Sequence, residues 1–92
     1  MPVVDLNVVG KHRVEDAVDF VKSFKLEKLF KEVYGCDIDE WDFEDSDDEV
    51  IATLLNKAFP ERVWIVEYHD DGNLGYFMIY ELNKDEPLKP IN

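Results

Sequence analysis

The chain has 92 residues and a formal net charge of -12 at pH 7. Nucleic-acid phosphates and anionic lipid heads would repel such a chain, so direct binding to either is disfavoured. With 46% hydrophobic residues it carries too much apolar surface for a disordered acidic tail. We expect one folded domain over residues 1–92, with a modest core because short chains bury only about 60 to 65% of their surface.

Cys36 is the one cysteine in the chain, which rules out an intrachain disulfide. The N-terminal residues lack the basic and apolar regions of a secretory signal. No run approaches the roughly 18 consecutive apolar residues that a membrane span requires. These features predict a cytoplasmic location and no membrane partner.

The first expected element is a short strand. Residues 3–9 are rich in β-branched side chains and are followed by Gly10, which predicts that the strand stops there. The next three residues, Lys11, His12 and Arg13, are all basic or titratable, and we interpret them as a solvated turn before the first helix.

Helical spacing follows from residue 14 to residue 34, where apolar positions recur every three or four residues. The phase of this pattern slips at residues 23–25, which leaves two alternatives: one bent helix or two short helices. Gly35 is a natural C-terminal stop for either arrangement.

Residues 37–49, called here the acidic segment, contain nine carboxylates in thirteen positions and no basic side chain. They supply -9 of the net charge of -12. Their apolar positions fit neither a strand nor a helix throughout, so we expect a loop with a short edge strand near residues 40–44. Ser46 followed by Glu49 forms a capping-box pattern, which predicts a helix that ends at Phe59-Pro60.

Two β-rich runs, residues 62–69 and 76–82, flank the dipeptide Asp71-Gly72, which is a strong hairpin signal. Both faces of the hairpin are apolar. Either helices cover both faces, or one face meets another chain. The remaining residues, 83–92, contain two prolines and are expected to be an extended tail.

The order of these elements predicts an α+β fold. We expect an antiparallel sheet of about three strands, made from the N-terminal strand and the C-terminal hairpin. Two or three helices are expected to pack on it.

No catalytic or metal-binding pattern is present. Cys36 has only His12 and His69 as imidazole partners, and both are distant in sequence. An EF-hand loop counted from Asp37 fails, because Trp41 falls at ligand position 5 and Asp48 at the position of the bidentate Glu. The glycines sit at element boundaries instead of in a phosphate-binding loop. We therefore expect a protein that is not an enzyme and uses no cofactor.

The acidic segment is the candidate partner-binding site. Carboxylates attract a basic partner over long range, and aromatic rings anchor an interface by burying area. The alternative is a solvated loop whose aromatic rings pin it to the core. The candidate binding residues are Asp37, Asp39, Glu40, Trp41, Asp42, Phe43, Glu44, Asp45, Asp47 and Asp48.

No family motif is matched. In size and charge alone, the chain resembles the small acidic inhibitors that phages and bacteria direct at nucleic-acid enzymes, including DNA-mimic anti-restriction proteins and immunity proteins. This analogy implies an inhibitor, either a monomer or a homodimer, that blocks a basic, nucleic-acid-binding surface on a partner protein. The alternative function is a structural or assembly domain that forms a homodimer through the aromatic face of the hairpin.

Overall fold

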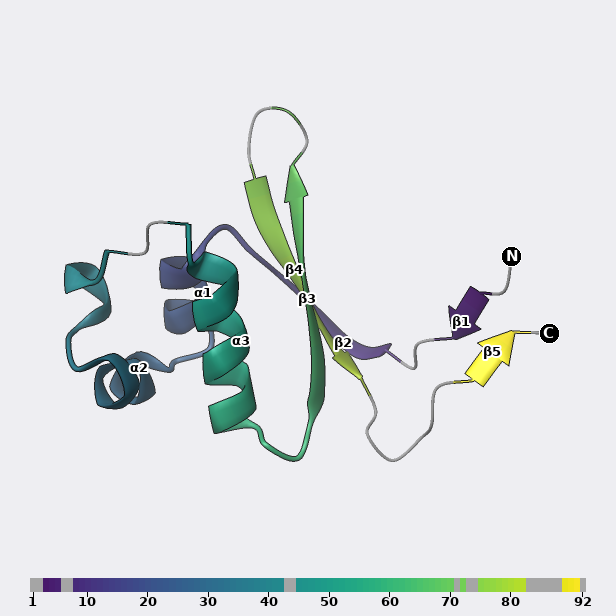
Figure 1. Cartoon of the computed structure of the whole chain (residues 1–92), viewed down its shortest axis with the longest axis horizontal. Helices are drawn as coiled ribbons and strands as arrows, with labels where there is room; N and C mark the ends of the chain where they lie inside the picture. Colours follow the sequence, from purple (N-terminus) through teal and green to yellow (C-terminus); the bar gives the residue numbers. More distant parts are fainter. Residues whose placement is uncertain are drawn as a thin grey trace.

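A computed structural model shows helices packed on one side of a three-stranded antiparallel sheet (Figure 1). This confirms the predicted α+β class. The described residues are 3–5, 8–42, 45–70, 72, 75–82 and 89–91, and the side chains of the first and last of these ranges are not considered.

The elements follow one another in a simple order. The helices are α1 (Ala17–Ser23), α2 (Glu27–Tyr34) and α3 (Asp47–Ala58), with a short 3-10 helix η1 (Ile38–Glu40) between the last two. The strands are β1 (Val3–Asp5), β2 (Val8–Val14), β3 (Val63–Asp70), β4 (Gly75–Leu82) and β5 (Lys89–Ile91).

The C-terminal hairpin forms as predicted. Strands β3 and β4 pair in continuous antiparallel register from Val63 opposite Leu82 to Asp70 opposite Gly75. Gly72 has a φ of 96°, which is a left-handed conformation that glycine adopts without strain. Asp71, the other residue of the predicted turn, lies outside the described residues.

The first strand of this sheet differs from the prediction. Strand β2 runs through Gly10 to Val14, so the interpretation of residues 11–13 as a turn was wrong, as was the predicted end of the strand at Gly10. Gly10 lies at a register shift in the pairing with β4, where a Cβ would come within 3.3 Å of the Glu81 carboxylate. The glycine marks an irregularity inside the strand and not its end.

The helical region between β2 and the acidic segment contains two short helices, which settles the alternative that the sequence left open. They begin at Ala17 instead of residue 14, and they separate where Lys25 adopts a φ of 57°. Asp16 caps α1 by accepting a hydrogen bond from the Asp19 amide at 2.8 Å. Gly35 ends α2 with a φ of 81°, as expected.

Helix α3 ends at Ala58, with Phe59 as its C-cap at the predicted end of the helix, and it packs against β3. Ser46 is its N-cap residue, but the Ser46 side chain makes no capping hydrogen bond. The predicted edge strand near residues 40–44 was wrong for its described part, because Glu40 belongs to η1 and the next two residues have no regular structure.

Among the described residues, no helix is both long and apolar enough to cross a lipid bilayer.

Strand β4 is the centre of the sheet, in the order β2-β4-β3. Its residues Phe77 and Ile79 face the helices and join the buried core. That core otherwise consists of side chains from β2, the helices and η1: Val14, Ala17, Phe20, Val21, Phe30, Ile38, Val50, Ile51, Leu54 and Leu55.

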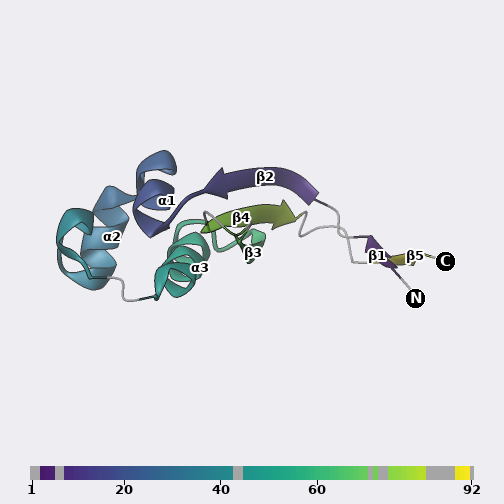
Figure 2. The ribbon, with the colours of Figure 1, turned by 90° about the horizontal axis from the view of Figure 1, so that it is seen from above.

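The helices lie on one face of the sheet, and no described helix lies on the other (Figures 1 and 2). We call the uncovered side the open face. Within the described residues it presents Val63, Ile65, Glu67 and His69 from β3, Tyr76, Met78, Tyr80 and Leu82 from β4, and Val8, Lys11 and Arg13 from β2.

The C-terminal tail was predicted to be extended. Residues 83–88 and 92 lie outside the described part, but residues 89–91 form β5, which pairs antiparallel with β1. Figure 2 shows this pair beyond the end of the main sheet, away from the helices.

Candidate functional site

The first residues of the acidic segment are held against the helices. Ile38 in η1 is buried, which ties the start of the segment to the core. On either side of it, Asp37 lies 3.6 Å from the Lys31 ammonium and Asp39 lies 3.6 Å from the Lys22 ammonium. Both ion pairs are exposed, so each contributes at most about 1 kcal/mol to stability. These two carboxylates already have cationic neighbours and are less available to a partner.

Trp41 pins the segment to α2. Its ring is half-buried, with its centroid 4.8 Å from that of Tyr34 and 6.1 Å from that of Phe30. For Trp41, the structure therefore shows the second alternative, in which the ring packs on the core and holds the loop there. Phe43 and Glu44 lie outside the described residues, while Glu40 and Asp42 are exposed.

Asp47 has a structural contact. Its Oδ2 atom accepts a hydrogen bond of 2.9 Å from the backbone amide of Ala17, the first residue of α1. One carboxylate at the start of α3 thus satisfies an amide that the first turn of α1 leaves without an intrahelical acceptor. Asp48, by contrast, is exposed and accepts a hydrogen bond from the neighbouring Glu49 amide.

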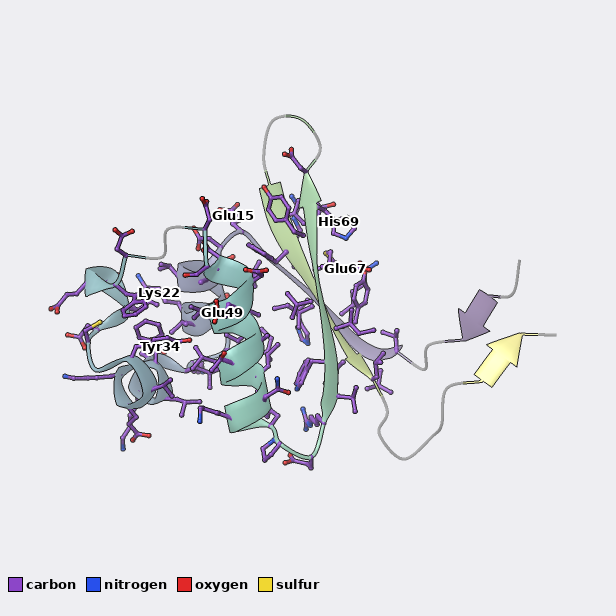
Figure 3. The ribbon with its side chains drawn as sticks, in the orientation of Figure 1. Glu15, Lys22, Tyr34, Glu49, Glu67 and His69 are labelled. Carbon is purple, nitrogen blue, oxygen red and sulfur yellow. The ribbon has the colours of Figure 1, made fainter. Side chains whose placement is uncertain are left out.

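The end of the acidic segment meets a second acidic stretch that sequence reasoning missed. Glu15 and Asp16, which precede α1, lie beside Asp45, Asp47 and Asp48 around one hollow of about 520 Å³. Figure 3 shows Glu15 close to the N-terminal end of α3. Two segments about thirty residues apart in the chain thus contribute carboxylates to one rim.

Aromatic residues of the hairpin complete this hollow, called here the acidic hollow. Its remaining lining residues are Tyr68, Gly75 and Phe77. Tyr68 is 60% exposed, and its ring centroid lies 5.1 Å from that of Phe77. A Cβ at Gly75 would collide with the Tyr68 hydroxyl, so the glycine makes room for the ring. The acidic hollow combines a carboxylate rim with an accessible aromatic ring.

The thiol and the two imidazoles that were considered as catalytic candidates lie on different elements. Cys36 follows α2, whereas His12 lies in β2 against the Phe24 ring, with the two centroids 5.1 Å apart. His69 lies in β3 with its Nε2 atom 3.1 Å from a Glu67 oxygen. Within the described part of the chain, no group of three or more His, Cys, Asp and Glu side chains is arranged to hold a metal ion.

The open face has its own electrostatics. The Arg13 guanidinium lies 3.9 Å from the centroid of the Tyr76 ring, and the Lys11 ammonium lies 5.7 Å from that of Tyr80. Loss of hydration, followed by the effect of the Glu67 carboxylate, raises the pKa of the Tyr80 phenol above its usual value of 10.0. Two cations of β2 thus each lie over an aromatic ring of β4 on this side of the sheet.

Comparison of the chain with known protein families, with curated proteins and with solved structures found no match.

Proposed function

We propose that this protein is a non-enzymatic binding protein that inhibits a partner by occupying a basic, nucleic-acid-binding surface on it. The observation that carries the proposal is the acidic hollow, where carboxylates from residues 15–16 and 45–48 surround the Tyr68 ring. An arginine side chain fits this chemistry, because its guanidinium pairs with carboxylates and stacks on aromatic faces.

The distribution of charge supports the same proposal. Residues 15–61 carry 15 acidic and 5 basic side chains, so most of the negative charge of the protein belongs to the helical side. A field of one sign speeds the approach of a partner of opposite sign and disfavours wrong partners. The hollow then provides the local contact that holds a basic side chain.

We propose that the residues which bind the partner are those that line the acidic hollow. Asp45 and Asp48 remain candidates, and Glu15 and Asp16 join them. Asp47 is engaged with α1, and Trp41 with α2, so substitution of either would change stability as well as binding.

The test is a titration with a fluorescent peptide of ten arginines at two salt concentrations, about 0.05 and 0.3 M. The site variant combines Glu15→Gln, Asp45→Asn and Asp48→Asn. The matched control combines Glu27→Gln, Glu32→Gln and Glu61→Gln, exposed residues that do not line the hollow, and removes the same number of charges.

The site variant should bind the peptide at least about tenfold more weakly than the control, with a shallower dependence on salt. Equal affinities and equal salt slopes for the two variants would reject the acidic hollow as the binding site. A labelled DNA duplex should bind neither the wild type nor the variants, because its phosphates meet the same negative field.

A further inference from the structure

The open face is a second surface feature of the protein, and the proposed role of the acidic hollow does not account for it. Tyr76, Met78 and Tyr80 are half-buried although no described helix covers this side of the sheet. Val8 and Val63, at the same end of the two outer strands, are 43% and 41% exposed. Antiparallel sheets that face water normally carry polar residues on that side, so this composition is typical of a covered surface.

The charges on the open face are separated between its two edges. Lys11 and Arg13 belong to β2 at one edge, and Glu67 belongs to β3 at the other. The register places Arg13, Met78 and Glu67 in one row across the sheet, with Met78 in the middle. Figure 3 shows Glu67 and His69 on the side of β3 away from the helices.

This row is complementary to itself. If a second copy packs face to face about a twofold axis parallel to β4, β2 of one copy lies over β3 of the other. Glu67 then faces Arg13 of the second copy, the reverse contact forms as well, and Met78 meets its own counterpart at the axis. In the neighbouring row Tyr80 lies at the axis, and Ile65 lies opposite Lys11 of the second copy.

The other face-to-face arrangement is unfavourable. A twofold axis across the strands would place β2 over β2 and β3 over β3. With that axis through the row of Met78, Arg13 would face Arg13 and Glu67 would face Glu67; with the axis midway between this row and that of Tyr80, Arg13 would face Lys11. Either position costs free energy because like charges are brought together. The charge pattern therefore selects one orientation of the second copy.

We propose that the open face binds a second copy of this chain in a symmetric dimer whose twofold axis runs parallel to β4. The strands cover about 14 Å by 26 Å when spaced by about 4.8 Å and extended by about 3.3 Å per residue. This area is smaller than the roughly 800 Å² per partner of a stable interface, so we expect a weak, transient dimer. The proposal concerns the opposite side of the sheet from the acidic hollow and does not depend on it.

The test is sedimentation velocity on the whole chain from about 1 to 500 µM, because a weak dimer becomes populated only at high protein concentration. Wild type should shift from the monomer mass of 10.8 kDa to twice that mass. The shift should persist in about 0.5 M NaCl because most of the interface is apolar. A chain that remains monomeric over this range overturns the proposal.

A charge exchange tests the orientation. Glu67→Arg and Arg13→Glu should each weaken dimerisation by at least about tenfold, because each places like charges opposite each other. The double variant with both changes should return to within about threefold of wild type, as expected for a pairwise contact. If the single variants weaken the dimer and the double variant does not restore it, the proposed axis is wrong.

Met78→Asp places two carboxylates at the axis and should abolish the dimer. Its matched control is Asn56→Asp, which adds the same charge at an exposed position on α3. Circular dichroism verifies that each variant is folded. If Asn56→Asp weakens the dimer as much as Met78→Asp, general charge repulsion accounts for the effect and the proposed face is wrong.

Discussion

Asp47→Ala tests whether the acidic segment holds the helices together. The Asp47 carboxylate accepts a 2.9 Å hydrogen bond from the Ala17 amide in a partly buried site. A hydrogen bond to a charged group contributes about 1.5 to 3 kcal/mol. Removing one negative charge from an acidic surface returns at most about 1 kcal/mol. The hydrogen bond is the larger effect, so the free energy of unfolding should fall by about 2 kcal/mol.

The assay is thermal and urea unfolding, with Asp48→Ala as the control. Asp48 lies in the same first turn of α3, so both variants lose a similar interaction with the helix dipole, and only Asp47 contacts α1. For a domain of this size about 1 kcal/mol corresponds to about 4 to 8 °C, so Asp47→Ala should melt about 10 °C lower. Asp47→Asn keeps an acceptor oxygen and should lose about half as much. If Asp47→Ala and Asp48→Ala melt together, the contact does not link the two helices.

Three further predictions concern other parts of the structure. Trp41→Ala should lower the free energy of unfolding in urea by about 2 to 3 kcal/mol, less than for a fully buried aromatic ring; a loss below about 0.5 kcal/mol would contradict the observed packing. Gly75→Ala should displace the Tyr68 ring and weaken arginine-peptide binding without changing the charge, and unchanged affinity would contradict a role for the ring. Because loss of hydration, and after it Glu67, raises the pKa of Tyr80, the stability that this tyrosine contributes is lost as pH rises through and above 10. Glu67→Gln should move the high-pH end of the ultraviolet tyrosine titration downward, and an unmoved titration would contradict the interaction.

The hairpin was predictable because residues close together in the sequence specify it. Alternating β-formers on both sides of Asp71-Gly72 specify two strands and the turn between them. Strand β2 was harder, because Gly10 and the three residues after it resemble a loop in isolation. Their strand conformation depends on pairing with β4, which lies more than sixty residues further along the chain.

The candidate site was predicted only in part for a similar reason. The concentration of charge in residues 37–49 is visible in the sequence, and so is its likeness to a partner-binding surface. The separate roles of these carboxylates are not visible in the sequence. Asp47 meets Ala17 thirty residues away, and the acidic hollow includes Glu15 and Asp16 because the starts of α1 and α3 lie side by side.

The position of β4 at the centre of the sheet also has a consequence for biosynthesis. Within the described sheet, β2 and β3 pair with β4 and not with each other. A ribosome makes β4 after both of its neighbours, so neither strand has its partner while the first 74 residues emerge. Helices can form early from local contacts, but the sheet must wait for residues 75–82. A nascent chain that stops before this strand would expose two unpaired strands and much of the core, a state suited to capture by a chaperone or a protease.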